Sequence, residues 1–324
     1  MKRVAIIGCG LIGEKRSRAL PGAEVAVCCD VDLARAEALA AQCPGARATA
    51  NWEEAAASDV DIVIVATIHS ELAKISERAA RAGKHVLAEK PAGRRAAELD
   101  PVIAAAEATG ARVRVGFNHR YHPAMLKARE IVDSGVAGPL IIVRGRYGHG
   151  GRPKGTDWRA IAELSGGGEA IDQGMHLIDL SRWFLGDFSG VQGAVPTCHW
   201  NMEVEDNAFF LLKTERGQYA QLHATWTEWK NMFSLEIYGS LGKIDISGLG
   251  GSYGEEKLTY YQMVEGQIKP DRTDFEFEKE DRSWHREFAE FVRDIDEGRD
   301  PNPGLRDAQA ALRIVETVYK EQGR

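Results

Sequence analysis

Short apolar runs alternate with helix-like stretches along the first part of the chain. The runs Val4–Ile7, Val25–Cys28 and Asp61–Val65 have the length and composition of strands that are buried on both faces of a sheet. Leu11–Leu20 and Leu33–Gln42 lie between them and have the character of covering helices. The same rhythm continues through residues 72–81, 85–87, 95–108 and 112–115. It predicts an α/β domain with a doubly wound parallel sheet.

The pattern changes after Gly116. An early helix is followed by strand-like runs with little helix between them, at residues 141–143, 208–212, 219–229 and 234–238, and then by two terminal helices. Runs of this kind, joined by turns such as Arg216-Gly217, favour antiparallel pairing. We therefore predict two domains, 1–120 and 121–324, the second an α+β domain with a large, mostly antiparallel open sheet.

A glycine-rich segment follows the first predicted strand and opens the first predicted helix. Gly8-Cys9-Gly10-Leu11-Ile12-Gly13 matches the G-x-G-x-x-G pattern in the strand–turn–helix context where it binds dinucleotides. Gly8 permits the tight turn, Gly10 the close approach of a pyrophosphate, and Gly13 the packing of helix on strand. Leu11 and Ile12 begin the helix whose backbone N–H groups face the phosphates. The first domain is thus predicted to be a Rossmann domain.

Asp30 ends the second predicted strand, about where an acidic side chain accepts hydrogen bonds from the adenosine ribose. A carboxylate there repels a 2′-phosphate, and Val31 follows it rather than Arg or Ser. We therefore predict NAD rather than NADP as the cofactor. Helix capping is the alternative role, but Asp32 is better placed to cap the helix that starts at Leu33.

Composition and charge exclude several classes of partner. The chain has a formal net charge of −7 and no long basic block, so nucleic acid is not expected to bind. Apolar residues make up 44% of the chain without forming a run of membrane-spanning length. Its five cysteines are odd in number and lack zinc spacing, which favours reduced thiols. We expect a cytoplasmic protein with no membrane partner and no metal.

Two further motifs lie downstream: Ala88-Glu89-Lys90-Pro91, and the segment from Gly166 to Asp179 that contains Asp172 and His176. Together with the glycine turn, they resemble the glucose-fructose oxidoreductase, inositol dehydrogenase and MocA family. The resemblance spans most of the chain. It implies a catalytic group of Lys90, Asp172 and His176, with Glu89 and Lys90 beside the cofactor.

These residue types suit hydride transfer from an alcohol. Loss of hydride leaves positive charge on the carbinol carbon unless the hydroxyl proton departs, so a base near neutral pKa is needed, and His176 is the natural one. Lys90 can stabilise negative charge that develops on oxygen, and Asp172 can orient the base or a substrate hydroxyl. Asp172, His176 and Asp179 share one helix face. A solvated ion pair, or a metal site with His149 or His199, are the alternatives.

The loop after the fourth strand departs from the family pattern. Relatives commonly have Pro at the position of Ile68 and His near Leu72. We still expect Thr67 to lie along the cofactor. His69 contacts the cofactor or, alternatively, polarises the start of the next helix.

Candidate substrate contacts lie in two segments. Asn118, His119 and Arg120 occupy the junction between the predicted domains, where pockets tend to form. Capping and salt bridges are the alternative roles there. The polar segment from Arg144 to Arg159 resembles a loop over a cleft, in which Arg146 can hold an anionic group and Trp158 can stack on a sugar. Arg152 and Lys154 add charge to it. An exposed loop with solvated charges is the alternative.

Trp226 and Trp229 are interpreted as packing or interface residues of the open sheet. A sheet face without covering helices readily pairs with a second subunit, so a homodimer or homotetramer is expected. The second domain is accordingly predicted to bind the substrate and to mediate oligomerisation.

The sequence leads to one principal function and two alternatives. The principal one is an NAD-dependent oxidoreductase that interconverts a secondary hydroxyl and a ketone on a small-molecule sugar, cyclitol or nucleotide sugar. One alternative is an enzyme that uses NAD for a transient oxidation during glycoside cleavage or elimination. The other is a non-catalytic sensor of sugars or nucleotides, although such a protein is expected to lose Lys90 or His176.

Overall fold

The computed structural model describes residues 1–151 and 157–323, so Arg152 and Lys154 of the predicted polar loop lie outside the described residues. The chain packs as two compact units. The first comprises Met1–Phe117, Glu163–Gly166 and Trp284–Arg313, and the second comprises Asn118–Ala162, Gly167–Ser283 and Ile314–Arg324. The chain first passes from the first unit to the second between Phe117 and Asn118, near the predicted boundary at residue 120. Packing differs from the predicted domains in placing Trp284–Arg313 with the first unit.

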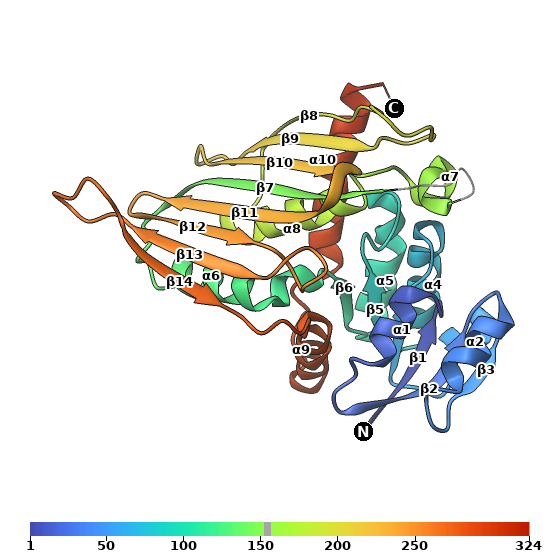
Figure 1. The fold of residues 1–324 in the computed structure, drawn as a ribbon. Coiled ribbons are helices and arrows are strands. Elements are labelled where there is room, and N and C mark those ends of the chain that lie inside the picture. Colours follow the sequence, from blue (N-terminus) through green and yellow to red (C-terminus); the bar gives the residue numbers. More distant parts are fainter. Residues whose placement is uncertain (152–156, 324) are drawn as a thin grey trace. The chain divides into compact units, whose positions relative to one another are not determined.

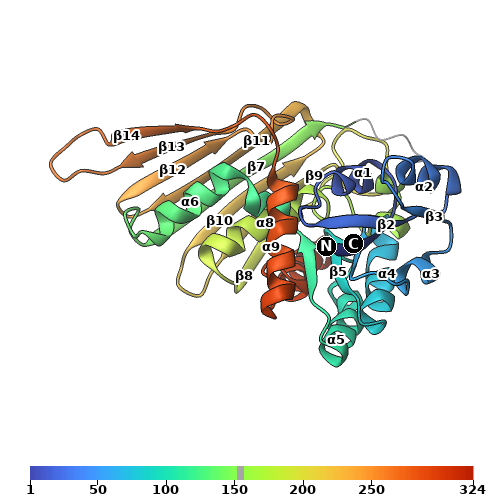
Figure 2. The same ribbon diagram turned by 90° about the horizontal axis from the view of Figure 1, so that it is seen from below.

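The first unit is built on a six-stranded parallel sheet of order β3-β2-β1-β4-β5-β6 (Figure 1). Its strands are β1 (Lys2–Ile7), β2 (Ala23–Cys29), β3 (Arg47–Thr49), β4 (Ile62–Val65), β5 (His85–Glu89) and β6 (Val113–Gly116). Its helices are α1 (Leu11–Ser17), α2 (Leu33–Ala40), α3 (Trp52–Ala56), α4 (His69–Arg81), a 3-10 turn η1 (Ala96–Leu99) and α5 (Asp100–Thr109). In Figure 2, α1 and α2 lie on one side of the sheet, and α4 and α5 on the other. The predicted Rossmann architecture is confirmed.

The sequence pattern does not predict two short elements of the first unit. β3 has 3 residues and α3 has 5, too few to show a period. α3 is instead defined by its cap, because the side chain of Asn51 accepts hydrogen bonds from the backbone N–H groups of Glu53 and Glu54.

Helix α9 (Ser283–Glu297) belongs to the first unit because it completes the unit's core. Phe288 and Phe291 are fully buried in one apolar cluster with Val4 and Ile6 of β1 and Leu39 of α2. Burial of an aromatic side chain of this size contributes about 1.5–3 kcal/mol. The amphipathic helix α9 is therefore part of the sheet's covering layer although it is distant in sequence.

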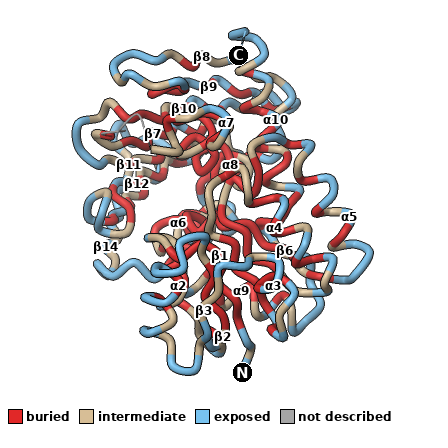
Figure 3. Tube along the Cα trace, turned by 90° about the vertical axis from the view of Figure 1, so that its right-hand side faces the viewer, coloured by how far each residue is buried: buried red, intermediate tan, exposed pale blue. Residues whose placement is uncertain are grey.

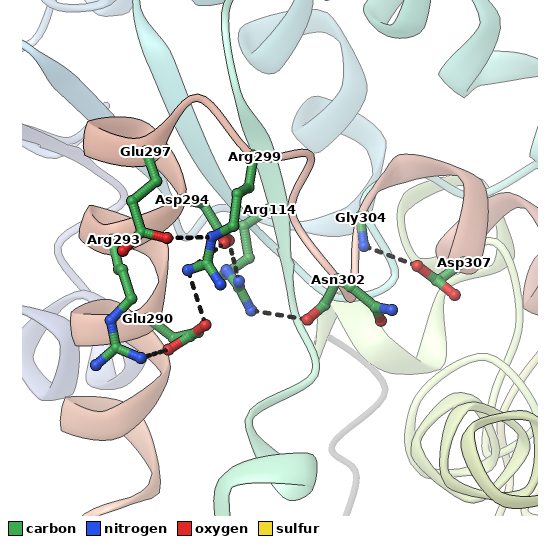
Figure 4. Close-up of polar contacts among 9 residues, drawn as sticks. All are labelled: Arg114, Glu290, Arg293, Asp294, Glu297, Arg299, Asn302, Gly304 and Asp307. Atoms are coloured by element: carbon green, nitrogen blue, oxygen red, sulfur yellow. Dashed lines mark hydrogen bonds and ion pairs between the residues drawn. The ribbon is translucent and has the colours of Figure 1, made fainter.

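The segment that follows α9 is held against β6 by a network of polar contacts (Figure 4). The buried guanidinium of Arg114 pairs with Asp294, and its Nη1 donates to the carbonyl of Asn302 over 3.3 Å. Asp294 also pairs with Arg299 at 3.0 Å, and Arg299 donates to Glu290 over 2.9 Å. These contacts tie β6 to α9 and to the turn before α10 (Leu305–Glu321).

The second unit is built on an eight-stranded sheet of order β14-β13-β12-β11-β7-β10-β9-β8. Its strands are β7 (Leu140–Gly150), β8 (Gly190–Ala194), β9 (Asn207–Lys213), β10 (Tyr219–Thr225), β11 (Thr227–Gly239), β12 (Gly242–Ser247), β13 (Lys257–Gln262) and β14 (Asp271–Glu276). All pairs are antiparallel except β7 with β10. The predicted mostly antiparallel sheet is confirmed, as is the turn at Gly217, which has φ +84°.

One predicted strand is wrong as a single element. Residues 219–229 contain the whole of β10, which stops at Thr225, and the first residues of β11, which starts at Thr227. The backbone N–H of Trp226 donates to the carbonyl of Asp206 over 2.9 Å, and that of Thr227 donates to the hydroxyl of Thr225 over 2.8 Å. These bonds turn the chain from one side of β7 to the other. Trp226 is buried and Trp229 is 63% exposed, so only Trp226 packs inside the second unit.

Two helices cover one face of this sheet. α6 (Pro123–Asp133) and α8 (Gln173–Leu185) lie on the same side in Figures 1 and 2, and almost the whole of α8 is buried (Figure 3). Shorter helical turns are η2 (Asn118–Tyr121), η3 (Trp158–Ala160) and α7 (Ala162–Ser165). None of the described helices is both long and apolar enough to cross a membrane.

Candidate functional site

The predicted cofactor residues of the first unit gather at one edge of its sheet. Gly8 follows β1, Asp30 follows β2, Thr67 follows β4 and Lys90 follows β5. Because these strands are parallel, their carboxyl ends meet at the same edge, which is where open α/β sheets bind ligands.

The glycines of the turn fit a bound dinucleotide. Gly8 has φ +98°, and a Cβ there would lie 2.4 Å from the carbonyl oxygen of Ala66. A Cβ on Gly13 would lie 2.0 Å from the carbonyl oxygen of Gly8, so both positions require glycine for packing. A Cβ on Gly10 would meet nothing within 4 Å. Gly10 thus borders open space, while Leu11 is 70% exposed and Ile12 is half-buried at the start of α1.

Asp30 is anchored to the glycine turn. Its Oδ2 accepts a hydrogen bond of 2.8 Å from the backbone N–H of Cys9, and its Oδ1 accepts one of 3.0 Å from that of Asp32. Asp32 in turn accepts from the backbone N–H of Ala34 and caps α2, as the sequence predicted. The carboxylate of Asp30 is therefore held beside the glycine turn, and Asp32 rather than Asp30 caps α2.

The two predicted cofactor residues of the loop after β4 have different surroundings. Thr67 is half-buried and donates to the carbonyl of Ile68 over 3.3 Å. His69 is buried, and its Nδ1 lies 2.8 Å from the carbonyl oxygen of Ser165. His69 thus binds the segment Glu163–Gly166 to the first unit, a role that the sequence did not suggest.

Glu89 is part of a buried charge network rather than a free acid. Nε of Arg16 donates to its Oε1 over 2.7 Å, and Nη1 of Arg16 pairs with Glu287 of α9 at 2.5 Å. The side chains of Arg16 and Glu287 are 1% and 0% exposed. A Cβ on Gly116 would lie 2.7 Å from Nη2 of Arg16, so the neighbouring strand leaves room for the guanidinium. This network fixes the end of β5 directly before Lys90, which is half-buried.

The second unit contains a buried aromatic and imidazole cluster around His176. The ring centres of His119 and His176 are 3.7 Å apart, and both residues are buried. Tyr147 of β7 contacts His119 edge-on, with ring centres 5.2 Å apart, and packs on Tyr253 at 4.8 Å. Complete burial raises the pKa of Tyr147 well above its usual value, and Tyr253 adds to the rise. Tyr147 therefore stays protonated at neutral pH.

His176 lies on α8, four residues after Asp172. Asp172 is the residue before the helix, and its Oδ2 lies 3.5 Å from Nε of Arg159, whose guanidinium stacks 4.3 Å from the ring centre of Trp158. Of the predicted loop residues, Trp158 thus lies next to the partner of Asp172.

The glycines before α8 have a local reason. A Cβ on Gly168 would lie 1.8 Å from the carbonyl oxygen of Glu205, and one on Gly167 would lie 1.9 Å from the hydroxyl of Tyr319. The buried carboxylate of Glu205 accepts from the backbone N–H groups of Gly168 and Ala170 and from the hydroxyl of Tyr319. Within the second unit, this bonding sets the direction in which α8 starts.

Three predicted substrate residues have structural partners. Arg120 forms a two-pronged pair with Asp179, with Nε 2.8 Å from Oδ2 and Nη2 2.6 Å from Oδ1, and both are buried. Asn118 donates to the hydroxyl of Ser283 over 2.8 Å. Arg146 pairs with Glu228 at 2.8 Å and points to the face of β7 opposite Tyr147, away from α8. The alternative interpretation, structural salt bridges, fits Arg120 and Arg146 better than substrate binding does, and the pair also occupies the carboxylate of Asp179 that a metal site needs.

The structure therefore divides the predicted site into two sets. Glycine turn, Asp30, Thr67 and Lys90 lie in the first unit, and His119, Asp172 and His176 lie in the second. Arg16 and Tyr253 were missed because neither belongs to a motif. Arg16 left one signal, since it falls three positions after Gly13 on the sheet-facing side of α1.

Two family profiles match the chain. The profile described as "Oxidoreductase family, NAD-binding Rossmann fold" matches residues 2–117, and the profile described as "GFO/IDH/MocA C-terminal domain" matches residues 125–245. The first match includes the glycine turn, Asp30 and Lys90, and the second includes Asp172 and His176. The predicted cofactor, NAD, is confirmed by the first profile.

Named relatives match two thirds of the chain or nearly all of it. The chain is 28% identical over 334 residues to an inositol 2-dehydrogenase of Rhodococcus erythropolis, with 98% of this chain and 92% of that protein covered. It is 31% identical over 228 residues to inositol 2-dehydrogenase 2 of Saccharopolyspora erythraea, with 66% of this chain and 63% of that protein covered.

Solved structures share both sheets. An oxidoreductase domain protein from Kribbella flavida superposes with a TM-score of 0.89 at 26% identity, with 99% of this chain and 97% of that chain covered. A levoglucosan dehydrogenase in complex with NADH and levoglucosan gives a TM-score of 0.89 at 21% identity, over 98% and 96% of the two chains, and shows the shared fold. Since the two profiles together span more than half of the sequence, the chain belongs to the GFO/IDH/MocA family of NAD-binding oxidoreductases.

Proposed function

We propose that the protein interconverts a secondary hydroxyl and a ketone on a sugar, cyclitol or nucleotide sugar by hydride transfer with NAD. The observation that carries the proposal is the buried His176 on α8, one turn after Asp172, in a chain that also retains Lys90 after β5 of its NAD-binding unit. The substrate class is supported by relatives named inositol 2-dehydrogenase and levoglucosan dehydrogenase.

The proposed mechanism transfers one hydride and one proton, the proton of the substrate hydroxyl. NAD, when bound, supplies the acceptor for the hydride. His176 accepts the proton of the substrate hydroxyl during oxidation and returns it during reduction. Lys90 donates a hydrogen bond to the same oxygen and stabilises its developing negative charge, while Asp172 orients a substrate hydroxyl or the imidazole. The network of Arg16, Glu89 and Glu287 holds the chain before Lys90 in place.

A direct test follows reduced nicotinamide by absorbance while the protein is incubated with NAD and a panel that includes myo-inositol, levoglucosan, other polyols and nucleotide sugars. We expect turnover of at least one polyol. Binding of NAD without any turnover favours the sensor. Tightly bound NADH in the purified protein, with glycoside cleavage and no net reduction of added NAD, favours transient oxidation.

Asp30 is expected to set the affinity for NAD. Because a hydrogen bond to a charged group contributes about 1.5–3 kcal/mol, Asp30→Ala is expected to raise the Kd for NAD roughly 10- to 100-fold. The affinity for NADP should fall less, since the repelling carboxylate is gone. Fluorescence titration with both reduced cofactors measures this, and Asp32→Ala, which removes the same charge two residues away, is the control. Equal weakening in both variants contradicts the assignment.

We also propose that the uncovered sheet face forms a homodimer or homotetramer. Phe209 and Leu211 of β9 are 43% and 44% exposed there and line a groove of about 490 Å³ with residues of β7, β8, β10 and β11. Phe209→Asp is expected to dissociate the oligomer in sedimentation velocity, because a buried interface does not accept an unpaired charge. Ile268→Asp, at a fully exposed position between β13 and β14, is the control. A wild-type protein that is monomeric at micromolar concentration would sink the proposal.

A further inference from the structure

A short segment of the chain leaves the second unit and returns to it. This crossing segment, Glu163–Gly166, belongs to the first unit, whereas Asn118–Ala162 before it and Gly167–Ser283 after it belong to the second. Asp172 and His176 follow the end of the crossing segment by six and ten positions. The passage of the chain between the units that lies nearest to these two residues in sequence is therefore the end of the crossing segment.

His69 is one anchor of the crossing segment. Its Nδ1 lies 2.8 Å from the carbonyl oxygen of Ser165, and the two residues are 4% and 1% exposed. Because a carbonyl oxygen only accepts, Nδ1 carries the hydrogen of this bond. A hydrogen bond between buried groups is costly to lose, since water does not replace the missing donor. His69 begins α4, two residues after Thr67, which we expect to lie along the cofactor.

Arg94 is the other anchor, four residues after Lys90. Its Nη1 donates to the carbonyl of Glu163 over 2.5 Å. Glu98 fixes the guanidinium in this position, because its Oε1 accepts from Nε of Arg94 over 3.2 Å and lies 3.0 Å from Nη2. Oε2 of the same carboxylate accepts from the backbone N–H of Arg94 over 2.8 Å. Arg94 is thus held by its own neighbour while it holds the start of the crossing segment.

The chain has little slack between these anchors and α8. Gly166 has φ +80°, and a Cβ there would lie 2.6 Å from Cβ of Arg94, so the end of the crossing segment rests directly on Arg94. On the other side of the crossing, the backbone N–H of Gly168 donates to the carboxylate of Glu205 over 3.0 Å. The carbonyl of Gly168 accepts from the backbone N–H of Asp172 over 3.0 Å. A displacement of the crossing segment is therefore passed to the start of α8.

We infer that His69 and Arg94 are positioning residues for hydride transfer, which hold the crossing segment on the NAD-binding unit and so set where the chain enters α8. This role rests on the proposed function, in which NAD and Lys90 act together with His176. The loops that carry Thr67 and Lys90 then also hold the entrance to the helix of His176. Misplacement of reacting groups by about 1 Å lowers a rate by about 100-fold. Loss of an anchor is therefore expected to slow hydride transfer without weakening the binding of NAD.

His69→Leu tests the first anchor, because it removes the donor to Ser165 and keeps an apolar side chain of similar size. With a polyol of the panel that shows turnover, NADH formation in a single turnover is expected to slow by about 10- to 100-fold. KM and the Kd for NADH should change by less than about twofold, since ground-state binding is not altered. His69→Asn places an amide nitrogen where Nδ1 lies and should restore most of the rate. Such a rescue separates the lost bond from a general loss of stability.

Arg94→Met is expected to slow NADH formation in the same way. Because both anchors hold one segment, the double variant should be little slower than the slower single variant. Arg95→Met and His285→Leu are the matched controls, since both replace exposed side chains of the same unit, and they should keep the wild-type rate. A raised Kd for NADH in His69→Leu assigns His69 to cofactor binding and overturns the inference. Wild-type rates in both single variants, or losses that multiply in the double variant, overturn it as well.

A second measurement needs no substrate. Hydrogen–deuterium exchange of the whole protein with saturating NADH is followed by mass spectrometry over residues 163–176. Their backbone amides are expected to exchange about tenfold or more faster in His69→Leu than in the wild type, and His69→Asn and His285→Leu should leave the exchange unchanged. If no polyol is turned over, the proposed function is wrong, and the exchange rates still decide whether His69 anchors the crossing segment. Slower turnover in His69→Leu with unchanged exchange overturns the inference and leaves the proposed function standing.

Discussion

Replacing His176 with glutamine is expected to lower kcat by about 10²- to 10⁴-fold, the range that a general acid or base contributes. The amide occupies similar space beside His119 but cannot accept a proton at neutral pH. The Kd for NADH should not change, because His176 lies in the second unit and the cofactor residues lie in the first. The pH limb that reports the base in kcat/KM should disappear. Steady-state kinetics from acid to alkaline pH and a fluorescence titration with NADH measure both effects.

His199→Gln is the control for this variant, since it replaces an exposed imidazole of the same unit. It should retain turnover and the pH limb. If His176→Gln keeps wild-type kcat, His176 is not the base, and the mechanism proposed for the chain must be abandoned. A rise in KM alone assigns His176 to substrate binding instead.

The largest loss of stability is expected from Arg16→Met. Removal of the guanidinium leaves Glu89 and Glu287 buried together without their cation, and breaking a buried ion pair in this way costs about 3–5 kcal/mol. The stacking of Arg16 on the ring of Trp284, 4.4 Å from its centre, is lost as well. Chemical denaturation followed by circular dichroism measures the change in free energy of unfolding. Arg18→Met, two residues away with a side chain 65% exposed, should change it by no more than about 0.5 kcal/mol. Equal losses would contradict a structural role for the network.

Glu287→Gln tests the same network from the other side. Burial raises the pKa of Glu287, Arg16 opposes the rise, and Glu89 adds to it. A carboxyl whose pKa is raised in the folded state holds its proton longer than in the unfolded state. Its contribution to stability is fully present below the ordinary value of 4.5 and is lost as pH rises through the folded-state pKa. The wild type should therefore gain stability relative to Glu287→Gln as pH falls toward 4.5, and a difference independent of pH argues against the raised pKa.

The sequence was sufficient for features whose physical cause is local. The glycine turn needs Gly8 for its positive φ and Gly13 because a Cβ there would meet the carbonyl oxygen of Gly8, and its place between strand and helix follows from apolar spacing. Asp32 caps the helix two residues later, and Asp30 follows the strand that precedes it, so their roles depend on short separations. The family motifs at Lys90 and at Asp172 to His176 are contiguous in the same way.

Some expectations from the sequence changed because of contacts that the hydrophobic pattern does not show. The apolar run from Tyr219 to Trp229 has the composition of one strand, but a backbone bond from Trp226 to Asp206 ends it. Arg120 and Arg146 carry the charge that an anionic substrate needs, yet their guanidinium groups are bound by Asp179 and Glu228. Residue type predicts what a side chain is able to bind, whereas the partner that comes within reach determines what it does bind.

By itself, then, the sequence determined the two sheet types, the dinucleotide turn, the preference for NAD and the family, because each depends on residues close together in the chain. Only the tertiary structure decided that α9 completes the core of the first unit, that Arg16 joins Glu89 to Glu287, and that His119 lies against His176. These contacts join residues far apart in sequence. Their free energy comes from burial and charge pairing, which exist only after the separate elements have packed.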